Sequence, residues 1–492
     1  MAPLLRLTCA LLAALLFACA SPRALEPPVP APAPAPAAPR EEAVWVDHLE
    51  RDLVPFWTQP AALGEPVGEF PTFRCHDGRA WSPADPCPEL AQAPPWIRDA
   101  LGRDYTRMRS RQTYFYGAAF HLLGDQRLLE LARAGALRIA ALVDTDGSVP
   151  SWRDSGALEP PPAQRTAQDL AYAQLGLAMY WYLTRDPAVL DPLVRVERHI
   201  FERYWRADWG MLAWTLGGPE AERQELVAQL DQVNAYLLLL APLLPEPHRA
   251  RWSADLRRVA RILVDRYWDE DSGMFWGRLD DPAERRPGGR HFDFGHSIKA
   301  LWMLERITVA TGDAQLAAWV RPRAAKLLER AYVAETGCWA SSPRADGTLD
   351  RSLSWWTFAE LDQTAATLAF ADRAQARYLR ATEACWFARL VDLEQGGVWA
   401  WADPEDAARH AGKAHLWKNA YHEGEHALVL AIAAAALANR PARLHFALPA
   451  GSADGELRPY FFTGKVVARQ PLAPARVLPG HQVERVEFAD LR

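Results

Sequence analysis

The chain has 492 residues, of which 50% are hydrophobic and 24% charged, and its formal net charge is −6. This composition is that of an ordinary globular protein and excludes a fully disordered chain. The acidic balance lacks the basic footprint of a nucleic-acid-binding protein, so no nucleic-acid partner is expected.

The N-terminus predicts an export signal. Arg6 precedes an apolar run over residues 7–20, which is shorter than the roughly 20 residues of a membrane-spanning helix. Residues 16–19 (LFAC) resemble a bacterial lipobox, so residues 1–19 are expected to be a signal peptide and Cys19 the lipidated residue, with ordinary secretion as the alternative. The Pro/Ala-rich residues 20–40 predict an extended linker. We therefore expect an exported protein of the bacterial cell envelope, periplasmic or on the outer membrane, held to the membrane through the lipid alone.

Residues 41–439 alternate apolar-periodic segments of helical length with short loops. Twelve helices are expected, at about residues 41–57, 103–123, 126–143, 165–184, 187–206, 225–243, 248–268, 292–311, 314–334, 354–371, 374–391 and 418–438. Loop glycines recur every 60 to 64 residues, at Gly147, Gly210, Gly273, Gly337 and Gly397. Helix pairs repeated at such a period can close into a ring. The expected fold class is all-α, an (α/α)6 barrel of six helical hairpins.

Three long segments rich in Gly, Pro and charge, at 58–100, 144–164 and 276–291, are expected to shape the mouth of a cavity. Cys75 and Cys87 flank a turn-rich part of the first segment and are candidates for a disulfide in an oxidising compartment. Cys338 and Cys385 are expected to be unreactive thiols of the core. No CxxC or other zinc-like spacing is present, so no metal is expected.

Residues 440–492 differ in character from the helical repeat. Runs at 444–448, 460–463 and 483–488 have the composition of strands. A small β-rich C-terminal appendage is therefore expected after the barrel.

Side chains able to do chemistry recur at one level of the repeat, 23 to 25 residues after a loop glycine. They are Tyr172, Asn234, His296, Glu360 and His422, with Asp231 near the same level and Arg111 one repeat before Tyr172. One symmetry operation would carry both histidines toward a common axis. Histidine can take and give a proton near neutral pH, and arginine can stabilise an oxyanion without titrating. The pattern indicates proton transfer on a neutral polar substrate.

Each candidate also has a structural explanation. A histidine on an apolar helix is more often a hydrogen-bonded core residue, and Glu360 could pair with an arginine or lysine. Lys299 and Glu425 lie one turn after the two histidines and could pair with each other, support the histidines or face solvent. Among 21 tryptophans, Trp356 and Trp417 are the candidates for stacking on a sugar ring, although most tryptophans fill cores.

These segments resemble the N-acylglucosamine 2-epimerase superfamily, which includes cellobiose 2-epimerases and mannose isomerases. The resemblance spans nearly all of residues 41–438. It is carried by residues 110–114 (SRQTY), 169–174 (DLAYAQ), 295–302 (GHSIKALW), 355–360 (WWTFAE) and 417–424 (WKNAYHEG). Each segment alone is a weak signal, whereas their order and spacing together are fairly specific.

The resemblance implies an (α/α)6 barrel and cofactor-independent chemistry at C2 of a reducing sugar. His296 and His422 correspond to the acid/base pair and Arg111 to the arginine near the substrate carbonyl. One histidine would remove the C2 proton of the open-chain sugar, giving an enediolate. Return of a proton to the opposite face of C2 would be epimerisation, and return to C1 isomerisation. Substrate contacts are expected from Tyr172, Asp231, Asn234, Trp356, Glu360 and Trp417.

The chain departs from the family pattern at three places. The family has glutamate where Lys299 stands and arginine where Glu425 stands, which suggests an exchange of charges that preserves a pair. A family segment carrying a histidine and a glutamate is replaced by residues 231–234 (DQVN). These departures leave the substrate open.

Two other functions are considered on the same barrel. A glycoside hydrolase could use Asp231 with Glu360 or Glu425, since such enzymes need two carboxyl groups across the scissile bond. A surface lipoprotein could bind carbohydrate without turnover. In every case the expected partner is a small sugar or an oligosaccharide, with no cofactor, and the protein is a monomer or homodimer.

Overall fold

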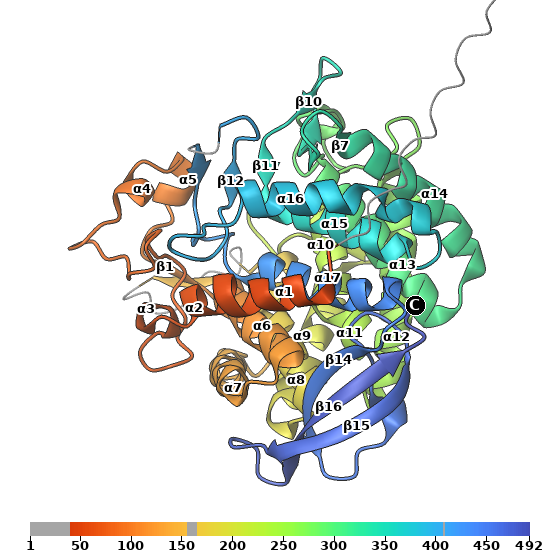
Figure 1. The fold of residues 1–492 in the computed structure, drawn as a ribbon. Coiled ribbons are helices and arrows are strands. Elements are labelled where there is room, and N and C mark those ends of the chain that lie inside the picture. Colours follow the sequence, from red (N-terminus) through yellow and green to blue (C-terminus); the bar gives the residue numbers. More distant parts are fainter. Residues whose placement is uncertain (1–39, 155–164, 407–408) are drawn as a thin grey trace, which may run out of the picture. The chain divides into compact units, whose positions relative to one another are not determined.

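The computed structural model describes residues 40–154, 165–406 and 409–492 (Figure 1). The expected signal peptide, Cys19 and nearly all of the linker lie outside the described residues. Within the described part of the chain, no helix combines the length and the apolar character needed to cross a membrane.

Six helices with nearly every residue buried form an inner ring. The neighbours α6·α8, α8·α10, α11·α13, α13·α15, α15·α17 and α17·α6 are in contact, which closes the ring. A helix that is apolar on all sides must be buried on all sides, which explains why these segments take the inner positions. The inner helices are α6 (Thr106–Leu123), α8 (Ala167–Thr184), α10 with its continuation α11 (Leu226–Gln232, Leu238–Leu240), α13 (Phe294–Thr311), α15 (Trp355–Leu368) and α17 (Tyr421–Leu437).

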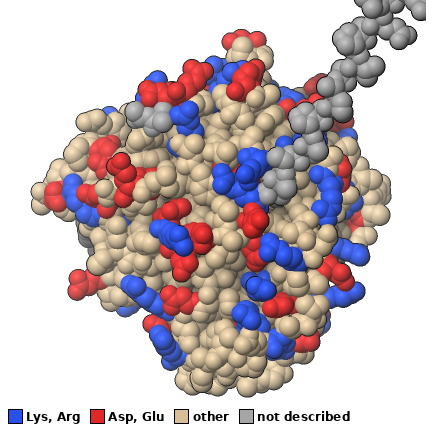
Figure 2. Space-filling model, viewed as in Figure 1, with Lys and Arg blue, Asp and Glu red and all other residues tan. Residues whose placement is uncertain are grey.

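Six outer helices pack around this ring with one apolar face inward and one polar face outward. They are α1 (Glu42–His48), α7 (Gln126–Ala140), α9 (Leu190–His199), α12 (His248–Ile262), α14 (Ala314–Ala331) and α16 (Leu379–Arg389). All twelve expected helices are thus present, and the (α/α)6 barrel is confirmed. Figure 2 shows acidic and basic side chains interspersed over the face that it draws.

Short antiparallel hairpins connect the end of an outer helix to the start of the next inner helix. They are β3–β4 (Trp205–Arg206, Met211–Leu212), β5–β6 (Trp268–Asp269, Met274–Phe275) and β7–β8 (Tyr332–Val333, Cys338–Trp339). The turns need a residue in the left-handed region, and Gly210 (φ 67°) and Gly273 (φ 63°) supply it. The glycine repeat of the sequence therefore marks the end of the barrel where the inner helices begin.

The C-terminal residues form a three-stranded antiparallel sheet in the order β14–β16–β15, from β14 (Ala442–Pro449), β15 (Lys465–Pro474) and β16 (His481–Ala489). Phe446 of β14 packs against His121 and Tyr182, near the C-terminal ends of α6 and α8. The sheet therefore covers the end of the barrel opposite to the glycine turns, at the lower edge of Figure 1.

The expected strand at 460–463 is wrong. These residues form a turn between β14 and β15, and Tyr460, Phe461 and Phe462 are buried in it. Their aromatic side chains pack on Tyr114, Trp302 and Phe370 of the inner helices rather than on a sheet, because burial against the barrel removes more apolar surface from water than an edge strand would.

Two disulfides are present among the described residues. Cys75 and Cys87 are bonded, which confirms the expected pair. Cys338 and Cys385 are also bonded, so their interpretation as free core thiols is wrong. The second bond joins β8 to α16, elements distant in sequence that the barrel brings together.

Candidate active site

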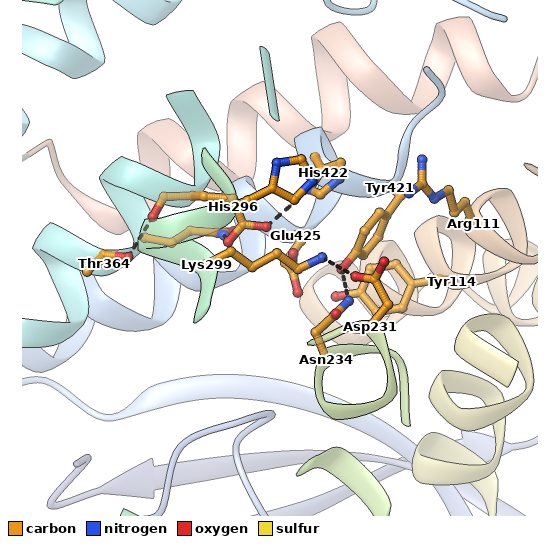
Figure 3. A network of polar contacts seen from close by, with 12 residues as sticks. Arg111, Tyr114, Asp231, Asn234, His296, Lys299, Thr364, Tyr421, His422 and Glu425 are labelled. Atoms are coloured by element: carbon orange, nitrogen blue, oxygen red, sulfur yellow. Dashed lines mark hydrogen bonds and ion pairs between the residues drawn. The ribbon is translucent and has the colours of Figure 1, made fainter. Parts of the chain in front are cut away.

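A cavity of about 220 Å³ lies at the end of the barrel where the inner helices begin. Both histidines open onto it, as the repeat predicts (Figure 3). The lining residues are Arg111, Gln168, Tyr172, Asp231, His291, His296, Lys299, Trp355, Trp356, Trp417 and His422. Eight of the eleven predicted site residues, Lys299 among them, are therefore brought together, whereas Asn234, Glu360 and Glu425 lie outside this lining.

His296 is held by the residue that begins its own helix. Asp293 caps α13, accepting a hydrogen bond from the His296 backbone N–H at 2.7 Å and contacting Nδ1 of its ring at 2.6 Å. Burial raises the pKa of Asp293, but His296 opposes this effect and the net pKa is lowered. An ionised carboxylate can only accept, so Nδ1 carries the hydrogen and Nε2 is free to take a proton. The carboxylate also stabilises the imidazolium that would form.

His422 has a different environment. Burial foremost, and then the charges of Arg111 and Lys299, lower the pKa of His422 well below 6.5. This imidazole is therefore neutral at pH 7. Its Nδ1 faces Oε1 of Glu360 at 3.5 Å, so Glu360 contacts a histidine rather than the arginine or lysine that we considered as its partner.

Trp356 lies beside both imidazoles. Its ring centroid is 4.7 Å from that of His296 and 6.0 Å from that of His422. Both are therefore positioned around one aromatic side chain that is itself part of the cavity wall. A flat apolar face at this place suits the apolar face of a sugar ring.

Arg111 is fixed against the opposite wall. Its guanidinium lies 4.1 Å from the centroid of the Tyr172 ring and donates a hydrogen bond to the carbonyl of Trp417 at 2.7 Å. These two contacts hold the permanent positive charge of Arg111 at the cavity and leave some of the five N–H donors of the guanidinium unused.

Lys299 forms an ion pair with Asp231, with Nζ and Oδ1 separated by 2.7 Å, and both groups contact the hydroxyl of Tyr172 at 3.1 Å. Burial and the pair act in opposite directions on each group; the pair prevails, lowering the pKa of Asp231 and raising that of Lys299. Of the alternatives considered for Lys299, pairing with Glu425 is therefore wrong, because its partner is Asp231. In Figure 3 the side chains of Lys299 and Asp231 point toward each other.

Glu425 and Glu360 form a buried carboxyl pair below the cavity. Burial, and then the charge of Glu425, raises the pKa of Glu360 well above 4.5. Burial also raises the pKa of Glu425 to about 6, although the hydroxyl of Tyr460 and the charge of Lys299 lower it. The hydroxyl of Tyr460, on the C-terminal turn, donates a hydrogen bond to Glu425 and accepts one from Tyr114 at 2.7 Å. Asn234 also lies at this level and donates to the hydroxyl of Tyr421 at 3.3 Å.

Glu360, His422 and Glu425 could also hold a metal ion, since one ligand atom from each lies within 4.8 Å of the others. Two carboxylates and an imidazole are a suitable donor set for a transition metal. The positive charge of Lys299 acts on both carboxyl groups and disfavours a second cation beside them. A proton shared by Glu360 and Glu425 relieves the repulsion between the two carboxylates without a metal ion. The absence of a metal cofactor stays a prediction.

Some site residues were not predicted from the sequence. Asp293 had a usable signal, because it precedes the first turn of a helix at the position of an N-cap. His291 had none, since it lies in the long segment 276–291 where no periodicity applies. Tyr460 had a misleading signal, because its aromatic neighbours resemble a strand.

A second, larger cleft of about 700 Å³ continues outward and shares Trp355, Trp356 and Trp417 with the cavity. Its outer wall comes mainly from the residues that follow the Cys75–Cys87 disulfide, including Trp96, which is 52% exposed. Segment 58–100 thus contributes to the mouth as expected, and so do residues 400–401 and 410–417, which were not predicted. The remaining lining residues are His76, Glu89, Leu90, Gln92, Ala93, Pro94, Ile97, Ala400, Trp401, His410, Ala411, Gly412 and His415.

Known proteins resemble the chain in sequence. A cellobiose 2-epimerase of Bacteroides fragilis is 25% identical over 342 residues, which cover 64% of this chain and 84% of that protein. A cellobiose 2-epimerase of Ruminococcus albus is 22% identical over 341 residues, with the same coverage. No protein-family model matches the chain.

Solved structures resemble the chain in fold. The cellobiose 2-epimerase of Spirochaeta thermophila superposes with a TM-score of 0.64 at 19% identity, covering 81% of this chain and 97% of that one. A D-mannose isomerase gives 0.60 at 14% identity, with 79% and 96% covered. An α-1,6-mannanase of Salegentibacter gives 0.51 at 12% identity, with 79% and 99% covered. These relatives and the matching barrel show that the chain is similar to sugar epimerases and isomerases, in agreement with the resemblance to the N-acylglucosamine 2-epimerase superfamily seen in the sequence.

Proposed function

We propose that the protein is a sugar 2-epimerase or aldose–ketose isomerase that acts on a reducing sugar by proton transfer between two histidines. The observation that carries the proposal is the shared cavity of His296 and His422, with a carboxyl group behind Nδ1 of each ring. Two differently supported imidazoles on one small cavity suit the removal of a proton and its return.

The mechanism begins with the open-chain sugar. Nε2 of His296 takes the C2 proton, and Asp293 stabilises the imidazolium that forms. The electrons of the broken C–H bond pass to the carbonyl oxygen and give an enediolate, whose negative charge lies near Arg111. His422 then returns a proton to the other face of C2, or to C1 for isomerisation. In the reverse reaction the two histidines exchange roles.

The inner cavity and the outer cleft suit different parts of a substrate. The inner one, at about 220 Å³, is below the usual range of about 300–1,000 Å³ for drug-sized ligands and suits one small ring. The outer cleft, at about 700 Å³, is within that range and its tryptophans offer faces for further glycosyl units. The substrate class that fits both is the reducing end of an oligosaccharide or a simple reducing sugar.

Export and lipid anchoring at Cys19 are part of the proposal. The two disulfides support it, because such bonds form and persist outside the reducing cytosol. Labelling of the protein with a radioactive fatty acid in cells, lost on Cys19→Ala, tests the anchor.

Deuterium exchange tests the activity directly. The protein is incubated in D₂O with a panel of reducing mono- and oligosaccharides, and mass spectrometry and NMR follow the label at C1 and C2. Incorporation is expected in the active protein and its loss, by a factor of at least about 10², in His296→Asn and His422→Asn. His248→Asn, on the outer helix α12, is the matched control and keeps the activity.

Other outcomes would replace the proposal. The absence of deuterium in every sugar, with sugar binding seen by calorimetry, would indicate a carbohydrate-binding protein. Cleavage of a glycosidic bond that survives both histidine substitutions but not Glu360→Gln would indicate a hydrolase.

A further inference from the structure

The C-terminal turn between β14 and β15 reaches into the barrel beneath the candidate site. Tyr460 is 1% exposed and has a φ of 60°. A bulky residue in this left-handed region is strained and persists only where its surroundings hold it. Tyr182 supplies that hold, since its hydroxyl donates to the carbonyl of Arg458 and accepts from the backbone N–H of Tyr460.

The hydroxyl of Tyr460 has a fixed direction. It accepts a hydrogen bond from Tyr114 and donates its own hydrogen to Oε1 of Glu425. A donor aimed at this carboxyl group favours its ionised form over the protonated one. Negative charge is therefore localised on Glu425 rather than on its neighbour Glu360.

The contacts of Glu360 favour its protonated form. Gln363 donates to its Oε2 at 3.4 Å, so a proton on Glu360 belongs on Oε1, the oxygen that faces Nδ1 of His422 at 3.5 Å. Nδ1 is completely buried and has no hydrogen-bond partner of normal length among the described residues. The contact is loose, as such bonds often are without substrate.

We propose that Glu360 is a proton reservoir behind His422, kept protonated because Tyr460 of the C-terminal extension fixes the negative charge on Glu425. The inference rests on the proposed function. In the resting state Oε1–H of Glu360 donates to Nδ1, and the hydrogen of the imidazole is on Nε2, toward the cavity. Glu360 is not expected to touch the substrate, so its role and that of Tyr460 are those of residues acting through His422.

The relay balances without another reactant. When Nε2–H gives its proton to the enediolate carbon, Nδ1 takes the proton of Glu360, so the ring stays neutral and Glu360 becomes a carboxylate. A neutral imidazole with a pKa far below 7 can thus deliver a proton without forming an imidazolate. His296 holds the proton taken from C2, and exchange with water returns it to Glu360 before the next turnover.

The charged and titratable groups around the relay belong to several inner helices and the C-terminal turn. Those acting on Glu425 and Glu360 are Tyr114, Asp231, Lys299, Tyr421 and Tyr460, and those acting on His422 are Arg111, His296, Lys299 and Lys418. Lys299 favours a negative charge on the pair, whereas the closeness of two buried carboxyl groups prevents both from ionising. One proton is therefore shared, and Tyr460 decides which group holds it.

The test uses Tyr460→Phe in the full chain, with Tyr180→Phe as the matched control. Each variant loses one buried tyrosine hydroxyl that donates to a carboxyl group, Glu425 in the case of Tyr460 and Asp186 in the case of Tyr180. The tautomer of His422 is read by ¹⁵N NMR at pH 7, with its signals assigned by comparison with His422→Asn. Thermal unfolding checks that each variant folds.

The unsubstituted protein and Tyr180→Phe are expected to hold the hydrogen on Nε2 of His422, and Tyr460→Phe to shift at least half of the population to Nδ1. Glu360→Gln keeps a donor to Nδ1 but cannot release a proton, so kcat is expected to fall by a factor of about 10²–10⁴ while KM changes less than threefold. Hydrogen on Nδ1 in the unsubstituted protein, or the same tautomer in a folded Tyr460→Phe, overturns the proposal. Absence of sugar turnover with the expected tautomers would instead refute the proposed function and leave the relay geometry in place.

Discussion

Replacement of Lys299 by methionine would expose the energetic role of the ion pair inside the cavity. Lys299 and Asp231 are 4% and 2% exposed in their side chains and 2.7 Å apart. Removal of one partner leaves a buried charge without compensation, which costs about 3–5 kcal/mol. We expect a loss at the lower end of this range at pH 7, because Gln168 and Tyr172 still donate to Asp231.

The pH dependence gives the sharper test. In the unsubstituted protein the pKa of Asp231 is below 3.8, so its stabilising effect is present above the unfolded pKa and is lost as pH falls through the folded one. In Lys299→Met burial acts without the lysine and raises the pKa of Asp231 above its unfolded value. The penalty is then present at pH 7 and decreases as pH falls through that raised pKa.

Urea unfolding of both proteins at pH 7 and pH 4 measures the difference. Lys299→Met with Asp231→Asn is the control, and it should be more stable at pH 7 than Lys299→Met alone. An equal loss of stability at both pH values, or a loss below about 1 kcal/mol at pH 7, would show that the pair is not the interaction that compensates Asp231.

Three further predictions concern other parts of the molecule. Replacing both Cys338 and Cys385 by alanine, which opens a loop of 47 residues, should cost about 4 kcal/mol of stability in urea unfolding. Gly295→Ala would place a Cβ 2.4 Å from the ring of Trp356, so the ring must move and KM for the sugar should rise at least about tenfold; an unchanged KM would mean that Trp356 does not contact substrate. His422, whose pKa burial lowers far below 6.5, should stay neutral in an NMR titration down to pH 6, and protonation near pH 6.5 would contradict the assigned environment.

The ring and its level of polar residues could be predicted from the sequence because both follow from local periodicity. Gly210 and Gly273 mark equivalent turns, and once twelve helices alternate, residues at one phase of the repeat such as His296 and His422 must face one axis. The helix ends were placed within a few residues, since N-cap and stop signals are local as well.

Pairings within the interior could not be predicted in this way. A pair of Lys299 with Glu425 was one alternative because each stands one turn after a histidine, but the distance between two side chains across a ring depends on the rotation of each helix. Asp231, on the neighbouring helix α10, is the group within reach. Two other contacts could not be predicted for the same reason: the disulfide of Cys338 with Cys385 and the hydrogen bond of Tyr460 to Glu425. Each joins elements whose relative position only the closed barrel defines.

The exchanged charges at Lys299 and Glu425 make sense as one electrostatic change rather than two. The family pattern has an acidic and a basic side chain at these two positions. Here the basic one, Lys299, pairs with Asp231, and the acidic one, Glu425, lies near a second carboxyl group, that of Glu360. Two buried carboxylates at that distance would leave the interior with an excess of negative charge, and a single proton removes it. Arg111 and Lys299 are then balanced by Asp231 and the singly ionised pair. The same arrangement that makes the departure from the family pattern electrostatically tolerable thus places a transferable proton behind His422, where the proposed reaction needs one.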